Sequence, residues 1–190
     1  SQDKDTATAN GEDTITFSVT LKNTKDEVTT SSKLVAEVSG SKNTQSELTK
    51  DGDAYKMTLK STKAEAKEVT FKISDLKLGS TKVTFEPGVF DAANTQVIPS
   101  KWTAATGDVI DLELHVRDSF DNQVKTENKP TNEWVLSVIE GDAEVTQLPS
   151  AANEWKAKIT TNKSTRIVLG GTYNNAAIPK QTIIYNNPQL

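Results

Sequence analysis

Apolar and polar residues alternate with a period of two along much of this chain. Near its start, Ile15, Phe17, Val19 and Leu21 alternate with threonine, serine and lysine. Successive side chains of a β-strand point to opposite faces of a sheet, so the pattern predicts a strand with one buried face. Turn-rich stretches separate this strand from four more in the first half. Those strands are predicted at Leu34–Val38, Tyr55–Leu59, Val69–Ile73 and Lys82–Phe85.

The same order of strands returns about 95–100 residues later. The residues Ile110 to Val116 repeat the first strand, and the later repeats fall at Trp134–Val138, Trp155–Ile159 and Ile183–Tyr185. We interpret this as duplication of a unit of about seven strands. The boundary is expected near Pro87-Gly88, which gives one domain over 1–90 and a second over 91–190.

Helical periodicity is almost absent from the chain. The best candidate, Ser61 to Lys67, is short, and we interpret it as a loop with one possible helical turn. The predicted fold class is therefore all-β, with two tandem β-sandwich domains of the immunoglobulin-like kind in an elongated arrangement.

Composition narrows the class of protein. Apolar residues make up 34% of the chain, which suits two small sandwiches better than one large globule. The 22 basic and 26 acidic residues leave no excess of positive charge for phosphates, so nucleic acid is not an expected partner. No apolar stretch approaches the roughly 20 residues that span a bilayer. The chain has no cysteine, which excludes disulfides, thiolate metal sites and a cysteine nucleophile.

Four segments resemble the group 1 bacterial immunoglobulin-like repeats of the intimin and invasin adhesins. A small, Thr- and Ala-rich strand, a Gly-acidic turn and an alternating strand occur in both halves, and each half has a later turn of the family's type. These segments are Thr6–Phe17, Thr49–Asp53, Ala104–Ile110 and Val116–Val124.

The chain also departs from the family's pattern. Asp121 and Gln123 stand where the family usually has Gly and Pro, and the first domain keeps only Asn23 and Val28 of that turn. The second domain has Ser150–Asn153 in place of the family's Thr-Asp-x-x-Gly. The resemblance implies export across the outer membrane and a role in adhesion, as a stalk or a distal tip.

Catalytic and metal-binding chemistry has little support. His115 is the single histidine, and it lies between Leu114 and Val116 on an alternating strand, so we expect it on the surface. Acidic residues cluster at Asp3, Asp5, Glu12, Asp13, Asp51 and Asp53. Their spacing does not repeat a calcium-binding loop, and we interpret them as solvated turns, with calcium at the domain junction as the alternative.

The three tryptophans all fall in the second predicted domain. Trp134 and Trp155 repeat the positions of Leu34 and Tyr55, so we expect them in the core. Trp102 lies in a polar stretch, and two readings stay open: packing under the first strand, or exposure as an anchor for a partner.

Loops rich in asparagine and aromatic residues also occur in the second domain. Asn tolerates positive φ, which suffices to explain its use in turns, but a sandwich end built from such loops can also bind. The candidate partner-binding residues are Trp102, Phe120, Asn122, Tyr173, Asn174 and Asn175, and Asn186 to Pro188 form a further candidate loop.

We therefore expect a non-catalytic adhesion or spacer module at the bacterial cell surface or outside the cell. It is expected to need no cofactor, to be monomeric, not to insert into a membrane, and to bind a protein such as a host-cell receptor. The alternative is a secreted two-domain effector, or a partner of a barrel-type outer-membrane exporter, that binds through its C-terminal domain or by pairing an edge strand.

Overall fold

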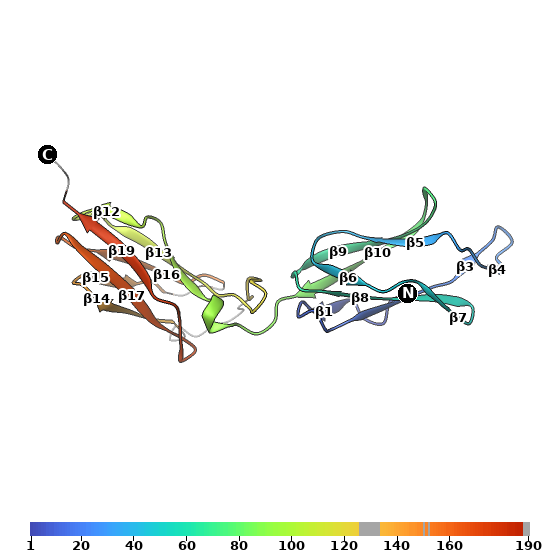
Figure 1. The fold of residues 1–190 in the computed structure, drawn as a ribbon, viewed down its shortest axis with the longest axis horizontal. Helices are drawn as coiled ribbons and strands as arrows, with labels where there is room; N and C mark the ends of the chain where they lie inside the picture. Colours follow the sequence, from blue (N-terminus) through green and yellow to red (C-terminus); the bar gives the residue numbers. More distant parts are fainter. Residues whose placement is uncertain (126–133, 150, 152, 188–190) are drawn as a thin grey trace. The chain divides into compact units, whose positions relative to one another are not determined.

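The chain folds into two compact units, Ser1–Gly88 and Val89–Leu190, which we call unit 1 and unit 2. A computed structural model describes residues 1–125, 134–149, 151 and 153–187. Within these ranges the chain forms β-strands and a single short 3₁₀ turn, Ala92–Asn94 (Figure 1). The all-β class predicted from the alternation is confirmed.

Unit 1 is a sandwich of two main sheets. The first has the strand order β1-β10-β9-β5, and the second has the order β2-β8-β6, with β7 also paired to β8. A small hairpin, β3 with β4, stands outside both. The strands are β1 Thr6–Thr8, β2 Ile15–Val19, β3 Leu21–Lys22, β4 Val28–Thr29, β5 Leu34–Val38, β6 Asn43–Gln45, β7 Thr49–Asp51, β8 Ala54–Ser61, β9 Glu65–Ile73 and β10 Leu76–Glu86.

Unit 2 is built in the same way. One sheet has the order β12-β19-β17-β14, with β18 paired to β17, and the other has the order β11-β13-β16-β15. The described strands are β11 Gln96–Pro99, β12 Thr103–Ala105, β13 Ile110–His115, β14 Trp134–Glu140, β15 Glu144–Gln147, β16 Lys156–Thr160, β17 Thr165–Tyr173, β18 Ala176–Ala177 and β19 Gln181–Asn186.

Each unit encloses its own apolar core between its two sheets. In unit 1, Phe17 of β2 lies opposite Met57 of β8, and its ring lies 6.2 Å from that of Phe71 on the facing sheet. In unit 2, Ile110 and Leu112 of β13 are buried with Ile167 and Ile183 of the other sheet. The residues that alternate in the sequence are therefore the ones that fill the cores, as predicted.

The first strand of each unit changes sheets. In unit 1, Gln2 bridges to Phe17 of β2, and β1 then pairs in parallel with β10. In unit 2, β11 pairs with β13, and β12 then pairs in parallel with β19. This crossover closes one side of each sandwich, and its recurrence supports the inferred duplication.

Two details of the expected secondary structure are wrong. Ser61 to Lys67 contains no helical turn: β8 ends at Ser61, β9 begins at Glu65, and only 62–64 connect them. Unit 1 also has ten strands rather than about seven. Thr20 separates β2 from β3, and residues 46–48 separate β6 from β7, so longer strands are divided into short ones. Alternation reports which face is buried, but it does not detect a local break in the hydrogen-bond ladder.

Candidate interaction surface

Phe120 is displayed at the surface of unit 2 by a turn built on Asp118. The Asp118 side chain is 2% exposed, and its Oδ1 accepts hydrogen bonds from the backbone N–H groups of Phe120 and Asn122, both at 2.9 Å. Asp121 adopts a φ of 64° within the turn, and Asp121 N–H donates to the Asp118 carbonyl. The carboxylate thus orders the turn while the Phe120 side chain is left 46% exposed.

Asn122 belongs to the support of this turn. Its side chain is 3% exposed, and its Nδ2 donates to Asp118 Oδ2 at 3.0 Å. Burial removes the amide from the reach of a partner. The structure therefore takes Asn122 out of the candidate surface.

Tyr173 is also a core residue. It has no measurable exposure, and its ring makes edge-to-face contacts with Phe90 at 4.9 Å and with Trp155 at 5.5 Å. Tyr173 therefore leaves the candidate surface as well. Its packing holds the end of β17 in place, directly before the turn that the next two residues make.

Asn174 and Asn175 form the tight turn between β17 and β18. Both are exposed, with φ values of 47° and 63°. Asparagine accepts this left-handed backbone more readily than most residues, so their use in a turn is confirmed.

The two turns lie at the same end of unit 2. Phe90 forms a β-bridge with Asp118, the base of the first turn, and packs on Tyr173, the base of the second. Phe120, Asn174 and Asn175 therefore project from one end of the sandwich on supports that are buried and hydrogen-bonded. We call these three residues the aromatic-asparagine end.

Trp102 lies elsewhere on unit 2. It stands in the crossover between β11 and β12, where its carbonyl accepts the N–H of Ile184 at 3.0 Å. Its side chain is 48% exposed, so the reading that it packs under the first strand is wrong. Asn186 and Asn187 lie on the same side of the unit as β12, since Thr106 N–H donates to the Asn186 carbonyl. Pro188 falls outside the described residues.

Trp134 and Trp155 are core residues, as predicted, with 3% and 2% exposure. Trp134 is the first residue of β14 and replaces Leu34 of β5, and Trp155 lies directly before β16 and replaces Tyr55 of β8. Neither indole Nε1 has a hydrogen-bond partner among the residues that the structure describes. Their role is therefore to fill the interior of unit 2.

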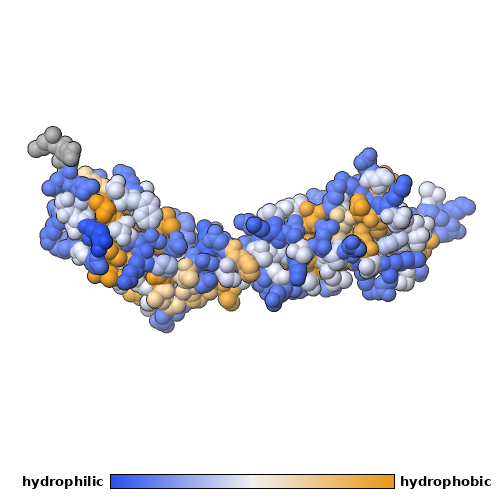
Figure 2. Space-filling view, in the orientation of Figure 1, coloured by the Kyte–Doolittle hydropathy of each residue, from blue (hydrophilic) through white to orange (hydrophobic). Residues whose placement is uncertain are grey.

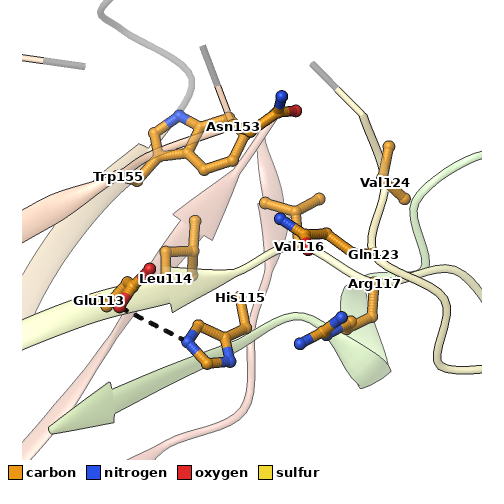
Figure 3. A pocket seen from close by; sticks show the side chains of 9 residues that line it. All are labelled: Glu113, Leu114, His115, Val116, Arg117, Gln123, Val124, Asn153 and Trp155. Carbon is orange, nitrogen blue, oxygen red and sulfur yellow. Dashed lines mark ion pairs between the residues drawn. The ribbon is translucent and has the colours of Figure 1, made fainter. Parts of the chain in front are cut away.

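A pocket lies beside the Asp118 turn (Figure 3). Glu113, His115 and Arg117 reach it from β13 and the residues that follow, and Asn153 and Trp155 line the other side. His115 Nε2 lies 3.8 Å from Glu113 Oε2, and the imidazole is 36% exposed. His115 is thus a surface residue, as predicted from its neighbours Leu114 and Val116, which are buried.

The acidic clusters have structural partners. Asp13 forms an ion pair with Lys4 and accepts the Thr8 N–H, and the Lys4 hydrogen bond lowers the pKa of Asp13. A hydrogen bond from Lys56 likewise lowers the pKa of Asp51. Among the described residues there is no group of three or more potential metal-ligating side chains. Likewise, the described part of the chain has no helix long and apolar enough to cross a membrane.

Gln147 makes a contact between the two sheets that could not be predicted from the sequence. It lies on β15, but its amide reaches the edge of the other sheet, where Oε1 accepts the Leu136 N–H at 3.0 Å and Nε2 donates to the Trp134 carbonyl at 2.9 Å. Gln45 of unit 1 similarly donates to the Ala36 carbonyl at 3.2 Å. A lone glutamine carries no periodic signal, so only the approach of two sheet edges shows this role.

The visible face of the molecule is mainly hydrophilic, with apolar patches on both units (Figure 2). Exposed apolar residues of unit 2 include Val135 and Ile139, both on β14, besides Phe120 and Trp102. The aromatic-asparagine end thus combines one apolar residue, Phe120, with the polar Asn174 and Asn175, a composition found at protein interfaces.

The chain matches no protein-family model, and a search of curated proteins finds no match. Solved structures do resemble it. InvD of Yersinia pseudotuberculosis aligns over 98% of this chain and 56% of its own, at 16% identity and a TM-score of 0.58. Invasin, a bacterial integrin-binding protein, aligns over 98% of this chain and 39% of its own, at 14% identity and a TM-score of 0.56. FdeC, an Escherichia coli adhesin, aligns over 98% of this chain and 63% of its own, at 17% identity and a TM-score of 0.50.

These likenesses establish the class of fold. Both units are bacterial immunoglobulin-like β-sandwiches, and they follow one another along the chain. The fold is that of the invasin-type adhesins, as the sequence motifs predicted. The chain spans less than two thirds of each of these three structures.

Proposed function

We propose that this chain is a non-catalytic adhesion and spacer module of a bacterial surface protein, and that it contacts a protein partner through the aromatic-asparagine end of unit 2. The observation that carries the proposal is Phe120, an exposed aromatic side chain held on a buried, hydrogen-bonded carboxylate. Exposed aromatic residues on ordered supports are the common anchors of protein interfaces, because little conformational entropy is lost on binding.

The fold supports the adhesive part of the proposal. The compared structures include invasin, which binds integrin, and FdeC, an adhesin. Tandem sandwiches suit a spacer, since each unit has its own core and keeps its shape independently. We place the chain outside the bacterial cell or on its surface, where such modules act.

Binding of the purified chain to host cells tests the proposed surface. Phe120→Ser should lower the apparent affinity about tenfold or more, the loss typical of an interface anchor. Val109→Ser is the matched control, because Val109 is 56% exposed. Val109 precedes the first residue of β13, whereas Phe120 follows the other end of this strand.

The outcome separates the possibilities cleanly. Equal loss in both variants would indicate nonspecific apolar adsorption, and unchanged binding of Phe120→Ser would refute the proposed surface.

Antibody against the chain should label intact bacteria of the source strain. Labelling only after the cells are permeabilised would refute the proposed location.

A further inference from the structure

The edge of β10 in unit 1 is open over most of its length. β10 pairs with β9 on one side, from Leu76 to Phe85. On its other side β1 covers only Thr84–Glu86. The remaining stretch, Leu76–Lys82, forms no strand pairing on that side with any described residue. We call this stretch the β10 edge.

The register shows which backbone groups the β10 edge presents. Thr84 donates its N–H across the edge to the Asp5 carbonyl at 2.9 Å. Backbone groups alternate along a strand, so the N–H and C=O of Lys82 and Ser80 point to the same open side. A bulge between Lys77 and Gly79 shifts this alternation, and it brings the groups of Lys77 to the open side as well.

At the edges of β14 and β5 a glutamine side chain bonds to the backbone, whereas the described contact at the β10 edge joins two side chains, Thr81 Oγ1 donating to Gln2 Oε1 at 3.0 Å. Gln147 occupies the pairing groups of β14, and Gln45 bonds to β5. In unit 2 the strand that corresponds to β10 is β19, which has six residues instead of eleven. Pro179 lies two residues before β19 and has no backbone N–H group that could donate a hydrogen bond. Among the described residues β12 pairs with Ile184–Asn186, so only 181–183 of β19 lie outside that pairing, a much shorter edge than that of β10.

The side chains of the β10 edge indicate what it would accept. Leu76 and Leu78 are 65% and 43% exposed. The charged residues within the edge are Lys77 and Lys82, and Lys77 forms an exposed ion pair at 3.7 Å with Glu68 of β9, from which an incoming carboxylate would have to draw it. An incoming strand with acidic side chains would form opposite-charge pairs across the ladder, whereas a second copy of this edge would bring only further lysines.

We propose that the β10 edge is a strand-addition site for an extended segment of a protein partner in which acidic and apolar residues alternate. The backbone of such a segment would complete the hydrogen bonds of Ser80 and Lys82, and its apolar side chains would cover Leu76 and Leu78. This site is separate from the aromatic-asparagine end, and it extends the proposed function to a second contact on unit 1.

NMR titration of the ¹⁵N-labelled 190-residue chain tests the proposal. The probe is a soluble nine-residue peptide in which glutamate alternates with valine, and its matched control has lysine in place of glutamate. The glutamate peptide should shift the amide signals of the β10 edge, and the lysine peptide should bind at least about tenfold more weakly.

Two variants locate the interaction. Ser80→Pro removes an N–H that points away from β9, so the fold should persist while the affinity for the glutamate peptide falls about tenfold. Lys77→Glu with Lys82→Glu should reverse the preference between the two peptides. The signals of the unit 1 core, such as those of Phe17 and Val69, show whether each variant is folded, and the signals of unit 2 report any binding at the other site separately.

Three results would overturn the proposal. Absence of shifts at millimolar peptide would mean that the edge is closed to strand addition. Shifts confined to residues outside the β10 edge would place the binding elsewhere. Shifts of the edge signals with protein concentration alone would show that a second copy, not an acidic segment, is the occupant.

Discussion

Lys67 of unit 1 and Ile167 of unit 2 occupy the same position of the two sandwiches. Lys67 lies opposite Val83 on the neighbouring strand, and Ile167 lies opposite Ile183. Both are buried, at 1% and 0% exposure. One unit thus fills this core position with a hydrocarbon side chain, and the other fills it with an ammonium group.

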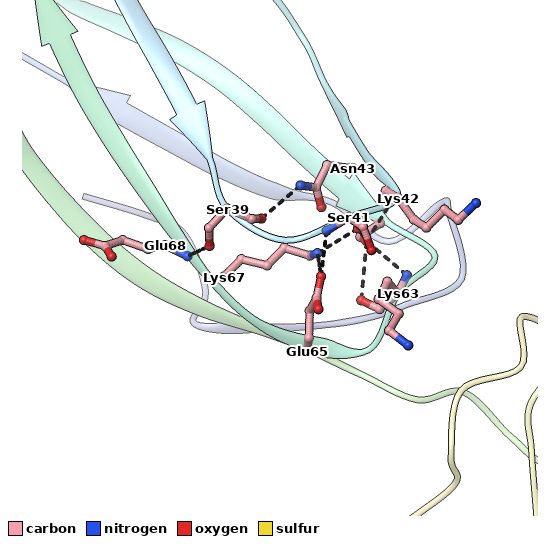
Figure 4. A network of polar contacts seen from close by, with 9 residues as sticks. Ser39, Ser41, Lys42, Asn43, Lys63, Glu65, Lys67 and Glu68 are labelled. Carbon is pink, nitrogen blue, oxygen red and sulfur yellow. Dashed lines mark hydrogen bonds and ion pairs between the residues drawn. The ribbon is translucent and has the colours of Figure 1, made fainter. Parts of the chain in front are cut away.

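The lysine is accommodated by a polar network at one end of unit 1 (Figure 4). Its Nζ donates to Glu65 Oε1 at 2.7 Å and to the Ser41 carbonyl at 3.0 Å, and it lies 5.9 Å from the centre of the Phe85 ring. Glu65 also accepts the Ser41 N–H at 2.8 Å. A buried charge needs such partners, because its desolvation is costly.

Lys67→Ala should destabilise unit 1 by about 3 kcal/mol, because it removes the ammonium group that donates to Glu65 and to the Ser41 carbonyl, leaves Glu65 with the Ser41 N–H, and opens a cavity. Lys67→Met fills the same space with an apolar chain, as unit 2 does, and should cost less than about 1.5 kcal/mol. Urea unfolding followed by the NMR signals of unit 1 measures both. Equal costs would mean that the network contributes no more than packing volume.

Acid should weaken unit 1 through Glu65. The hydrogen bond from Lys67 lowers the pKa of Glu65 from its ordinary value of 4.5. The folded state therefore favours the ionised carboxylate. Its stabilising contribution is complete above pH 4.5 and is lost as the pH falls through the lower pKa of the folded state. Glu65→Gln should reduce the difference in unfolding free energy of unit 1 between pH 7 and pH 3. If the variant lost as much unfolding free energy between pH 7 and pH 3 as the unaltered chain, groups other than Glu65 would cause the acid sensitivity.

Gln147 should protect unit 2 from self-association. Gln147→Ala frees the N–H of Leu136 and the carbonyl of Trp134, and it should cost about 1–2 kcal/mol for the two hydrogen bonds. It also opens the edge of β14, which carries the exposed Val135 and Ile139. Light scattering over a range of concentrations should show association of the variant. Gln45→Ala, which loses one bond, is the milder comparison, and a monomeric Gln147→Ala would show that the amide is not needed as a cover.

Gly171 is a position where a side chain is excluded. Its φ is 127°, and a Cβ built there would lie 1.9 Å from the Val135 carbonyl oxygen of the adjacent strand. Gly171→Ala should therefore destabilise unit 2 by more than about 3 kcal/mol. Gly52→Ala is the control in unit 1, because a Cβ there meets no atom within 4 Å and only the φ of 62° is unfavourable. It should cost about 1 kcal/mol.

Tryptophan fluorescence is a convenient readout for unit 2, since all three tryptophans lie there and two are buried. The fluorescence transition of Gly171→Ala should move to much lower urea than that of the unaltered chain. An unchanged transition would mean that β14 can withdraw from Gly171 at little cost. For Gly52→Ala the fluorescence transition should not move, because unit 1 has no tryptophan.

The alternation of apolar and polar residues was enough to predict the all-β class and the repeated order of the strands. Alternation at residues such as Ile15 and Phe17 is a local property, because neighbouring side chains of a strand must face opposite ways. The same reasoning correctly placed Trp134 and Trp155 in the core and His115 on the surface. Likewise, the paired asparagines correctly indicated a turn, since positive φ is a preference of the residue itself.

Which polar residues are buried and which are exposed could be seen only in the folded chain. Asn122 and Tyr173 looked like binding residues in a loop, yet both are buried, one on Asp118 and the other among aromatic rings. The contacts of Lys67 and Gln147 join residues 26 and 13 positions apart in the sequence. A polar side chain can be buried wherever a partner satisfies it, and that partner comes from another part of the chain that only folding brings near.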